Sequence, residues 1–218
     1  MSEQIYQIAI DGPSGAGKST IAKAVAGILH IDYIDTGAMY RAIGYKISRD
    51  GVDMNDEAAL AEMLAETDVD LSEGKVLLDG EDVSGKIRTP EMSKMASACS
   101  AIGAVRVKLV ELQRGMAKSK SVIMDGRDIG TNVLTDAKYK IYLTATVEER
   151  ANRRYKELIE KGETVTYDEV LEDMKQRDYN DSHRQLNPLR KADDAIEIDS
   201  TDMTLQGVVD RILGIVGE

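Results

Sequence analysis

The sequence has little of several features that mark common classes of protein. Cys99 is the only cysteine among 218 residues, so the chain can form no internal disulfide, which is typical of a reducing compartment. No apolar run is long enough to cross a membrane, and residues 1–4 lack the basic and apolar regions of a signal peptide. These absences predict a cytoplasmic protein that binds no membrane, with Cys99 as a small buried side chain.

Basic charge and large aromatic side chains are also scarce. Lys and Arg number 28 against 39 Asp and Glu, a net charge of −11, which argues against broad binding to nucleic acid. There is no Trp or Phe, and the two histidines and one cysteine form no zinc-binding pattern. Any site for an anionic ligand must therefore gather its arginines locally.

The strongest motif is a phosphate-binding loop near the N-terminus. Residues 12–19 read G-P-S-G-A-G-K-S, which matches the P-loop pattern, with the apolar run Ile5–Ile10 before it and a helical pattern over Lys18–His30 after it. The alternative is a Gly-rich turn into an ordinary helix, but strand, loop and helix all stand where a P-loop needs them. The predicted nucleotide-binding residues are Gly12, Pro13, Ser14, Gly15, Ala16, Gly17, Lys18, Ser19 and Thr20.

The residue types in this loop explain its chemistry. Glycines let backbone N–H groups approach a phosphate, and the following helix points its positive end at the same anion. Lys18 supplies a cation for the β- and γ-phosphates, and the Ser19 hydroxyl is the predicted Mg²⁺ ligand.

Apolar runs and helical patterns alternate along the rest of the chain. We predict an α/β fold of three layers, the P-loop kinase fold, with a five-stranded parallel sheet. Its strands are expected at 5–10, 31–34, 121–125, 138–145 and 195–199, and its helices at 18–30, 38–49, 55–66, 89–117, 147–162, 167–184 and 204–215. The helix over 89–117 is expected to be capped by Thr89 and to be interrupted near Gly103. Asn55 is the expected cap of the helix over 55–66, and T-V-E-E at 146–149 and T-Y-D-E at 166–169 are expected to form capping boxes.

Two segments depart from this alternation and define the predicted domain plan. Short strands at 69–71, 75–78 and 83–87, separated by turns, predict a small antiparallel insertion. Arg-rich helices over 150–184 predict a mobile lid. We therefore divide a single domain of 1–218 into a core (1–54, 89–149 and 185–218), an insertion (about 55–88) and a lid (about 150–184).

Polar residues gather at several predicted strand and helix ends. Thr36 and Arg41 could reach an anion at the carboxyl edge of the sheet, or they could be a helix cap and a solvated charge. Arg177, Asp181 and Arg184 share a helix face, which fits either a ligand site or an intrahelical ion-pair ladder. Arg150, Arg153 and Arg154 fit either lid arginines or a solvated basic face. The run Asp125–Gly130, which reads D-G-R-D-I-G, is the strongest local signal after the P-loop.

Taken together, these segments resemble the bacterial cytidylate kinases from end to end. The resemblance rests on the P-loop, on D-T-G-A-M-Y-R at 35–41, on D-G-R-D-I-G-T at 125–131, on Q-R-D-Y-N-D at 176–181 with Arg184, and on P-L-R-K-A-D-D-A at 188–195. It implies transfer of the γ-phosphoryl group of ATP, with Mg²⁺, to CMP or dCMP. The insertion implies a monophosphate-binding region.

The resemblance also assigns roles to single residues. It implies that Arg41, Arg127 and Arg184 hold the CMP phosphate, with Thr36 beside them. It implies that Ser100, Arg106 and Asp128 read cytosine, that Arg177 and Asp181 hold the ribose, and that Arg153 and Arg154 lie near the ATP phosphates. Catalysis would then rest on Lys18, Arg127 and Arg184, without a dedicated general base.

Two other functions remain open from the sequence. One is a kinase for another small acceptor, such as UMP or a shikimate-like metabolite. The other is a P-loop regulatory ATPase, which would need a water-positioning residue and no second ligand site. We expect a monomer, because no spare apolar face is evident.

Overall fold

The computed structural model describes residues 5–72 and 74–217, so the N-terminal segment 1–4 discussed above lies outside the described residues. The chain forms two compact units, Met1–Tyr33 with Ser119–Glu218, and Ile34–Lys118. The predicted insertion falls inside the second unit, which is longer than the insertion at both ends. No helix within 5–72 and 74–217 is long and apolar enough to span a membrane.

The first unit is built on the parallel sheet. Strand order is β2-β6-β1-β7-β8, and the pairs β1–β6, β1–β7 and β7–β8 are parallel. This confirms the predicted α/β class and its five strands. The strands are β1 (Gln7–Asp11), β2 (Asp32–Asp35, at the boundary between the units), β6 (Val122–Gly126), β7 (Tyr139–Thr144) and β8 (Ile196–Asp199).

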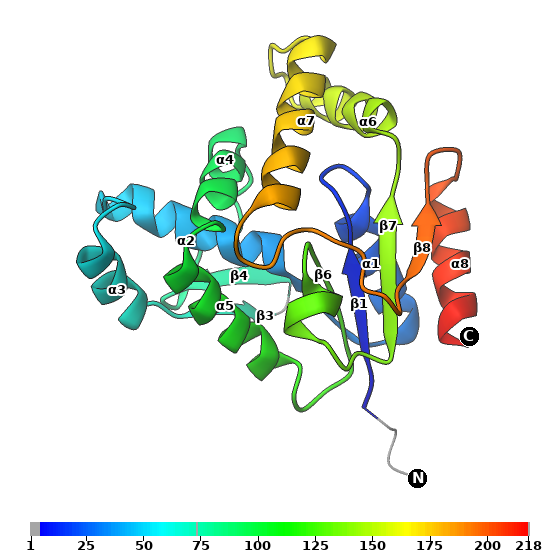
Figure 1. Ribbon diagram of the computed structural model, residues 1–218, viewed down its shortest axis with the longest axis horizontal. Coiled ribbons are helices and arrows are strands. Elements are labelled where there is room, and N and C mark those ends of the chain that lie inside the picture. The colour runs from blue at the N-terminus through cyan, green and yellow to red at the C-terminus, as the bar shows by residue number, and fades with distance from the viewer. Residues whose placement is uncertain (1–4, 73, 218) are drawn as a thin grey trace. The chain divides into compact units, whose positions relative to one another are not determined.

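Helices cover this sheet because each carries an apolar stripe. In α1, Ile21 and Val25 are buried, and in α8, Val208 and Ile212 are buried in the same apolar cluster as β1, β7 and β8. Figure 1 shows α6 and α7 side by side beyond the carboxyl ends of β1 and β7. The helices are α1 (Lys18–Leu29), the π-helix η1 (Ile129–Val133), α6 (Val147–Glu160), α7 (Tyr167–His183) and α8 (Leu205–Val216).

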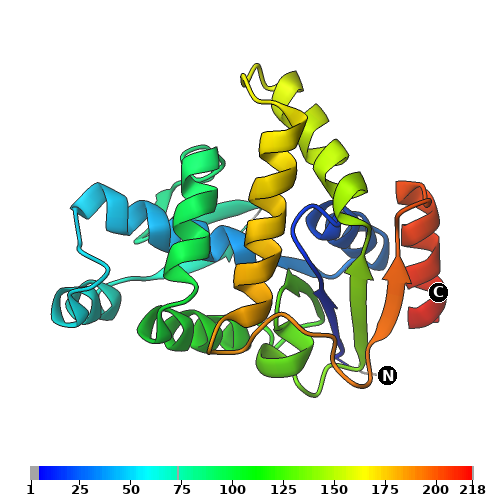
Figure 2. The same ribbon diagram turned by 45° about the horizontal axis from the view of Figure 1, so that its top comes forward.

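The second unit packs helices around a small antiparallel sheet of order β3-β4-β5. Figure 2 shows α4 beside α2, and the two approach closely because Gly44 has no side chain: a Cβ there would lie 2.9 Å from the Met95 Cβ. The elements are α2 (Thr36–Asp50), α3 (Glu57–Ala65), β3 (Val69–Ser72), β4 (Lys75–Leu78), β5 (Glu81–Asp82), α4 (Pro90–Cys99) and α5 (Gly103–Met116).

Helix ends show where the sequence patterns were accurate. The break near Gly103 is confirmed, because α4 ends at Cys99 and α5 begins at Gly103. The cap by Thr89 is confirmed, since its hydroxyl accepts from the Met92 N–H. The full capping box at Thr166 and Glu169 is also confirmed. Cys99 is fully buried, as expected.

Three local predictions were wrong. The segment 83–87 is a turn rather than a strand, although Val83 and Ile87 are buried, and the third strand is Glu81–Asp82. The cap of α3 is Asp56, one residue after the predicted Asn55, because the Asp56 carboxylate accepts from two helix N–H groups.

The third wrong prediction concerns a helix start, and so does one alternative that the sequence left open. At α6 the capping box is only half formed, since the Thr146 hydroxyl accepts from the Glu149 N–H while the Glu149 carboxylate binds Arg153 instead. Thr36 does not cap α2; the Asp35 carboxylate does, and Thr36 is the first residue of the helix.

Candidate functional site

The P-loop adopts backbone conformations that only glycine tolerates well. Gly12, Gly15 and Gly17 have φ of 150°, 74° and 88°. A Cβ at Gly12 would lie 1.9 Å from the Leu143 carbonyl oxygen, and one at Gly15 would lie 2.6 Å from the Met174 Cε. The loop is therefore fitted against β7 and α7, and it leads through Gly17 into the N-terminus of α1, which is ready to receive an anion.

Lys18 is held inside this loop. Its Nζ donates to the Pro13 carbonyl at 2.7 Å, and the side chain is buried. Burial, and then the nearby charge of Arg127, lower the pKa of Lys18 from 10.5 to about 7. A bound polyphosphate would favour the charged form, so Lys18 is poised to gain a proton as an anion arrives.

Ser19, the predicted Mg²⁺ ligand, points at a carboxylate that the sequence analysis did not assign. The Ser19 hydroxyl donates to Asp125 at 2.9 Å, and the Tyr33 hydroxyl donates to the other Asp125 oxygen at 2.7 Å. Asp125 is the penultimate residue of β6 and the first residue of the D-G-R-D signal. That position, beside a P-loop in a parallel sheet, could have identified it from sequence.

Asp11 is a second residue that the sequence analysis missed. It ends β1, and its two carboxylate oxygens accept from the Ile129 and Gly130 N–H groups, both at 2.7 Å. Burial raises the pKa of Asp11 from 3.8 to about 6, against the lowering effect of these two bonds. Asp11 thus anchors the start of η1, the turn that follows Asp128, and π-turns are frequent at functional sites.

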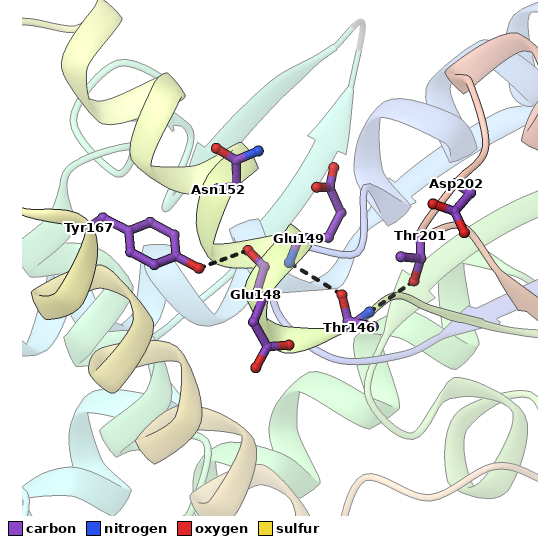
Figure 3. A pocket seen from close by; sticks show the side chains of 7 residues that line it. All are labelled: Thr146, Glu148, Glu149, Asn152, Tyr167, Thr201 and Asp202. Atoms are coloured by element: carbon purple, nitrogen blue, oxygen red, sulfur yellow. Dashed lines mark hydrogen bonds between the residues drawn. The ribbon is translucent and has the colours of Figure 1, made fainter.

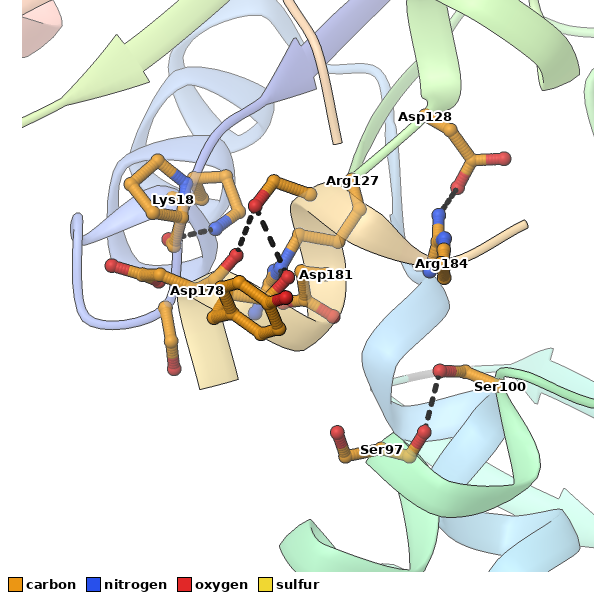
Figure 4. A network of polar contacts seen from close by, with 12 residues as sticks. Lys18, Ser97, Ser100, Arg127, Asp128, Asp178, Asp181 and Arg184 are labelled. Carbon is orange, nitrogen blue, oxygen red and sulfur yellow. Dashed lines mark hydrogen bonds and ion pairs between the residues drawn. The ribbon is translucent and has the colours of Figure 1, made fainter. Parts of the chain in front are cut away.

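A cluster of arginines and aspartates lies beside the P-loop in the same unit, and Figure 4 shows its contacts. Arg127 Nε donates to Asp181 at 2.8 Å, and Arg184 Nη2 donates to Asp128 at 2.9 Å. Asn132 donates to the second Asp128 oxygen at 3.0 Å. An intrahelical ladder over 177–184 is therefore not what forms, because these charges pair with residues that follow β6.

Arg177 contributes the unbalanced charge of this cluster. Its Nε is buried and has no acceptor among the residues that the structure describes. Burial, and then repulsion from Arg127, lower the pKa of Arg177. For Asp181, burial would raise the pKa, but the charge and hydrogen bond of Arg127 outweigh it and leave the pKa lowered. The cluster is thus suited to an anion.

The predicted lid arginines are engaged on α6 in this conformation. Arg153 donates to Glu149 and to the oxygens of Ser200, and Arg154 donates to Glu157 at 2.8 Å. Within the described residues, neither makes a hydrogen bond or ion pair with residues 12–20, so their place near the ATP phosphates remains a prediction.

The second unit holds the other predicted acceptor residues. Arg41 lies 3.3 Å from Asp35, and its Nε is buried without an acceptor in the described part of the chain. Arg106 is buried, donates to the Ser100 carbonyl at 3.3 Å and lies over the Tyr40 ring. The Ser100 hydroxyl donates to the Ser97 carbonyl at 2.8 Å, and Thr36 is buried at the start of α2.

A surface hollow of about 460 Å³ lies elsewhere in the first unit, and Figure 3 shows its lining. Thr146 and Tyr167, at the starts of α6 and α7, line it together with Thr201 after β8. Its charged lining residues, Glu148, Glu149 and Asp202, are all acidic, so it does not suit a phosphate. The P-loop and the arginine cluster remain the candidate site.

Comparisons with known proteins agree with this geometry. A family model described as cytidylate kinase matches residues 8–218. A cytidylate kinase of Caldicellulosiruptor saccharolyticus is 55% identical over 210 residues, covering 94% of this chain and 93% of the relative. Another, of Caldanaerobacter subterraneus subsp. tengcongensis, is 53% identical over 206 residues, covering 94% and 92%.

A solved structure supports the fold. A shikimate kinase from Bacteroides thetaiotaomicron superposes with a TM-score of 0.53 at 12% identity, covering 99% of this chain and 100% of that one. At this identity the likeness concerns the fold alone, and it confirms the P-loop kinase architecture.

Proposed function

Because the chain belongs to the cytidylate kinase family, we propose that it transfers the γ-phosphoryl group of ATP to CMP or dCMP, giving ADP and CDP or dCDP. The observation that carries the proposal is the charge excess beside the P-loop. Arg127 lies close enough to Lys18 to lower its pKa, and the Arg177 Nε is buried without an acceptor among the described residues. A second phosphate, next to the one in the P-loop, would balance these charges.

The chain's residues divide the work between the two ligands. The loop from Gly12 to Thr20 would bind the ATP phosphates, with Lys18 on the β- and γ-phosphates and Arg153 and Arg154 reaching them as the lid closes. Arg127 and Arg184 would hold the CMP phosphate, with Arg41 and Thr36. Alignment and neutralised charge suffice for phosphoryl transfer, so no general base is needed.

The same residues would select the base and the ribose. Asp128 would accept from the cytosine amino group, and Ser100 and Arg106 would serve the ring acceptors. Uracil presents a carbonyl where cytosine has its amino group, so a carboxylate there disfavours UMP. Arg177 and Asp181 would hold the ribose.

The donor set fits Mg²⁺. Ser19 and Asp125 offer hard oxygen atoms 2.9 Å apart, and within the described residues no group of three or more His, Cys, Asp or Glu could cage a metal alone. Mg²⁺ usually takes one or two protein oxygens and completes its shell with water and substrate phosphates. When bound, it would neutralise charge on the transferring phosphoryl group.

We further propose that the protein acts as a monomer in the cytoplasm, to be tested by light scattering and by cell fractionation.

The test is ADP formation from ATP and Mg²⁺ with CMP, dCMP, UMP, AMP or shikimate, each supplied alone. Activity confined largely to CMP and dCMP is the expected result. Faster turnover with UMP or AMP would remove the cytosine assignment while keeping the kinase. ADP formation that needs no acceptor would indicate an ATPase and remove the roles of Arg41, Arg127 and Arg184.

Asp128→Asn tests base selection within that assay. The amide can present a donor to the uracil carbonyl, so the preference for CMP over UMP should fall about tenfold, the value of one hydrogen bond. Asp136→Asn, an exposed acidic residue nearby in sequence, is the control and should leave the preference unchanged.

A further inference from the structure

One buried arginine on α6 has no role in the proposed chemistry, yet it joins three parts of the first unit. The Arg150 guanidinium donates to the Ala145 carbonyl at 2.9 Å, to the Ser14 carbonyl of the P-loop at 2.9 Å and to Asp178 of α7 at 2.6 Å. Its side chain is almost fully buried. A solvated basic face, one of the two interpretations of this arginine from sequence, is therefore wrong for Arg150.

The contact with Ser14 fixes the direction of a P-loop peptide. In a trans peptide the C=O and the following N–H point in opposite directions. When Arg150 holds the Ser14 carbonyl on one side, the Gly15 N–H must point to the other side, away from α6. Lys18 does the same for the preceding peptide, since it holds the Pro13 carbonyl at 2.7 Å. Two successive peptides are thus oriented by side-chain cations.

The space around this contact is too tight for the loop to choose another arrangement. A Cβ at Gly15 would lie 3.2 Å from the Arg150 Cβ and 2.6 Å from the Met174 Cε. The tip of the P-loop therefore lies directly against both α6 and α7. Movement of these helices would therefore displace the loop, through packing contacts as well as through the Arg150 hydrogen bond.

The contact with Asp178 extends the link to the acceptor side of the site. Asp178 follows Arg177 on α7 and precedes Asp181 by less than one turn. One Asp178 oxygen is buried without a donor among the described residues, so Arg150 is the cation that compensates this carboxylate. The pair is costly to break from either side, because each partner would leave a poorly solvated charge.

We propose that Arg150 is a positioning residue that couples the P-loop to α7, setting the direction of the Gly15 N–H for ATP and transmitting the position of α7 to it. Arg150 itself touches neither substrate. The inference rests on the proposed function only for the identity of the nucleotide, since it concerns how the loop is held for a polyphosphate.

Arg150→Lys is the informative variant. Lysine keeps the charge that Asp178 needs but lacks the planar fork that reaches three acceptors at once, so the Ser14 contact should be lost. We expect the dissociation constant for ATP to rise about tenfold, as for loss of one hydrogen bond to a charged group, while the constant for CMP alone changes less than twofold. Thermal unfolding verifies the fold, and Lys161→Met at the end of α6 is the matched control.

Asp178→Asn covers the case in which Arg150→Lys does not fold. The amide keeps one oxygen for Arg150 and removes only the charge, so ATP affinity should fall about threefold. Glu172→Gln, an exposed position on the same helix, is its control. If the pair acts as one unit, the two substitutions combined should weaken ATP binding by clearly less than the product of the single effects.

A spectroscopic readout separates positioning from general loss of structure. The amide resonance of Gly15 should shift or broaden in Arg150→Lys, while resonances of β8 and α8 stay in place. An ATP affinity within twofold of the parent in folded Arg150→Lys, or equal losses for ATP and CMP, would overturn the proposal. ATP titration needs no acceptor, so this outcome is independent of whether CMP proves to be the substrate.

Discussion

The P-loop and the arginine cluster are both suited to bind anions, but they differ in how far the protein itself satisfies their polar and charged groups. In the loop, Lys18, Ser19 and the Ser14 carbonyl each have a protein partner, and a Cβ at Gly12 or Gly15 would clash with neighbouring atoms. In the cluster, Arg177 keeps a buried Nε without an acceptor in the described chain, as does Arg41 in the second unit. The backbone conformation of the loop is already set for its ligand, whereas the cluster attracts its ligand through charge that the protein does not balance.

This difference has an energetic meaning. When the conformation of a site is already fixed, its conformational entropy is lost during folding, and little changes when the ligand binds. A site with excess buried charge is less stable when empty and gains most when the ligand arrives, which links binding to closure of the structure around it. Four experiments test this difference between the two sites.

The largest effect is expected where geometry is removed. Gly12→Ala would place a methyl group 1.9 Å from the Leu143 carbonyl oxygen in a conformation of φ 150°. β1 and β7 would have to separate locally, so we expect a loss of at least about 3 kcal/mol of stability and no measurable ATP binding. Denaturant unfolding and calorimetry would measure both.

Gly27→Ala is the matched control for that change. Gly27 lies on the exposed side of α1, and an added Cβ meets nothing within 4 Å. Alanine there should stabilise the protein by about 0.5–1 kcal/mol and leave ATP binding unchanged. A folded, ATP-binding Gly12→Ala protein would show that the loop is less constrained than its contacts indicate.

Removing the charge inside the loop should affect turnover more than folding. Lys18→Met should lower kcat by about a thousandfold, the scale of losing one group that stabilises charge in the transition state. Stability should change little, because a desolvated amine is replaced by an apolar side chain while the Pro13 carbonyl loses its donor. Lys23→Met, an exposed position on α1, serves as the comparison in steady-state assays. Near-parental turnover by Lys18→Met would remove Lys18 from the mechanism.

The cluster should separate stability from binding. Arg177→Met removes the unbalanced buried charge, so the melting temperature should hold or rise while KM for CMP increases about tenfold. Asp181→Asn removes the negative charge that faces Arg127, so it should cost about 1–3 kcal/mol of stability as well as acceptor affinity. If Arg177→Met lowered stability as much as Asp181→Asn, the cluster would be a structural network rather than a site prepared for an anion.

The smallest effect is a pH dependence in the loop. Burial lowers the pKa of Lys18 to about 7, so above pH 7 the free protein holds Lys18 largely neutral, and ATP binding must take up a proton. ATP affinity should therefore fall as pH rises from about 7.5 to 9, by at most tenfold per pH unit. Calorimetry in two buffers with different ionisation enthalpies counts the protons, and Lys18→Met should abolish the uptake. No proton uptake by the parent protein would contradict the lowered pKa.

The sequence was most informative where one residue type is required by geometry. The P-loop glycines, the β/α alternation and the break at Gly103 each follow from local rules, and all were confirmed. The errors arose where two groups compete for one partner. Asp56 caps α3 instead of Asn55, and the Glu149 carboxylate accepts from Arg153 instead of from the Thr146 N–H. Local pattern cannot decide such competition because tertiary contacts do.

The same limit applies to the site. Lys18 and Ser19 are recognisable from one continuous motif, but the Asp125 carboxylate that accepts from Ser19 was not assigned from it. Asp11 and Asp125 were missed, and the contact of Arg150 with the P-loop was not foreseen, because each acts through a residue more than 100 positions away along the chain. The direction of a carboxylate or guanidinium across the sheet depends on strand order, which composition and spacing do not determine. The roles of the arginine cluster remain predictions for the assays above.

The burial of Cys99 has a practical consequence. Its thiol lies against the carbonyl groups of Tyr40 and Ala96, and burial raises its pKa to about 12, so it stays protonated and inaccessible at neutral pH. The unmodified protein is therefore expected not to react with maleimides or mild oxidants. A cysteine introduced at an exposed position such as Glu172 would be the one reactive thiol, and a single fluorophore there could report the motion of α7 in an otherwise unmodified protein.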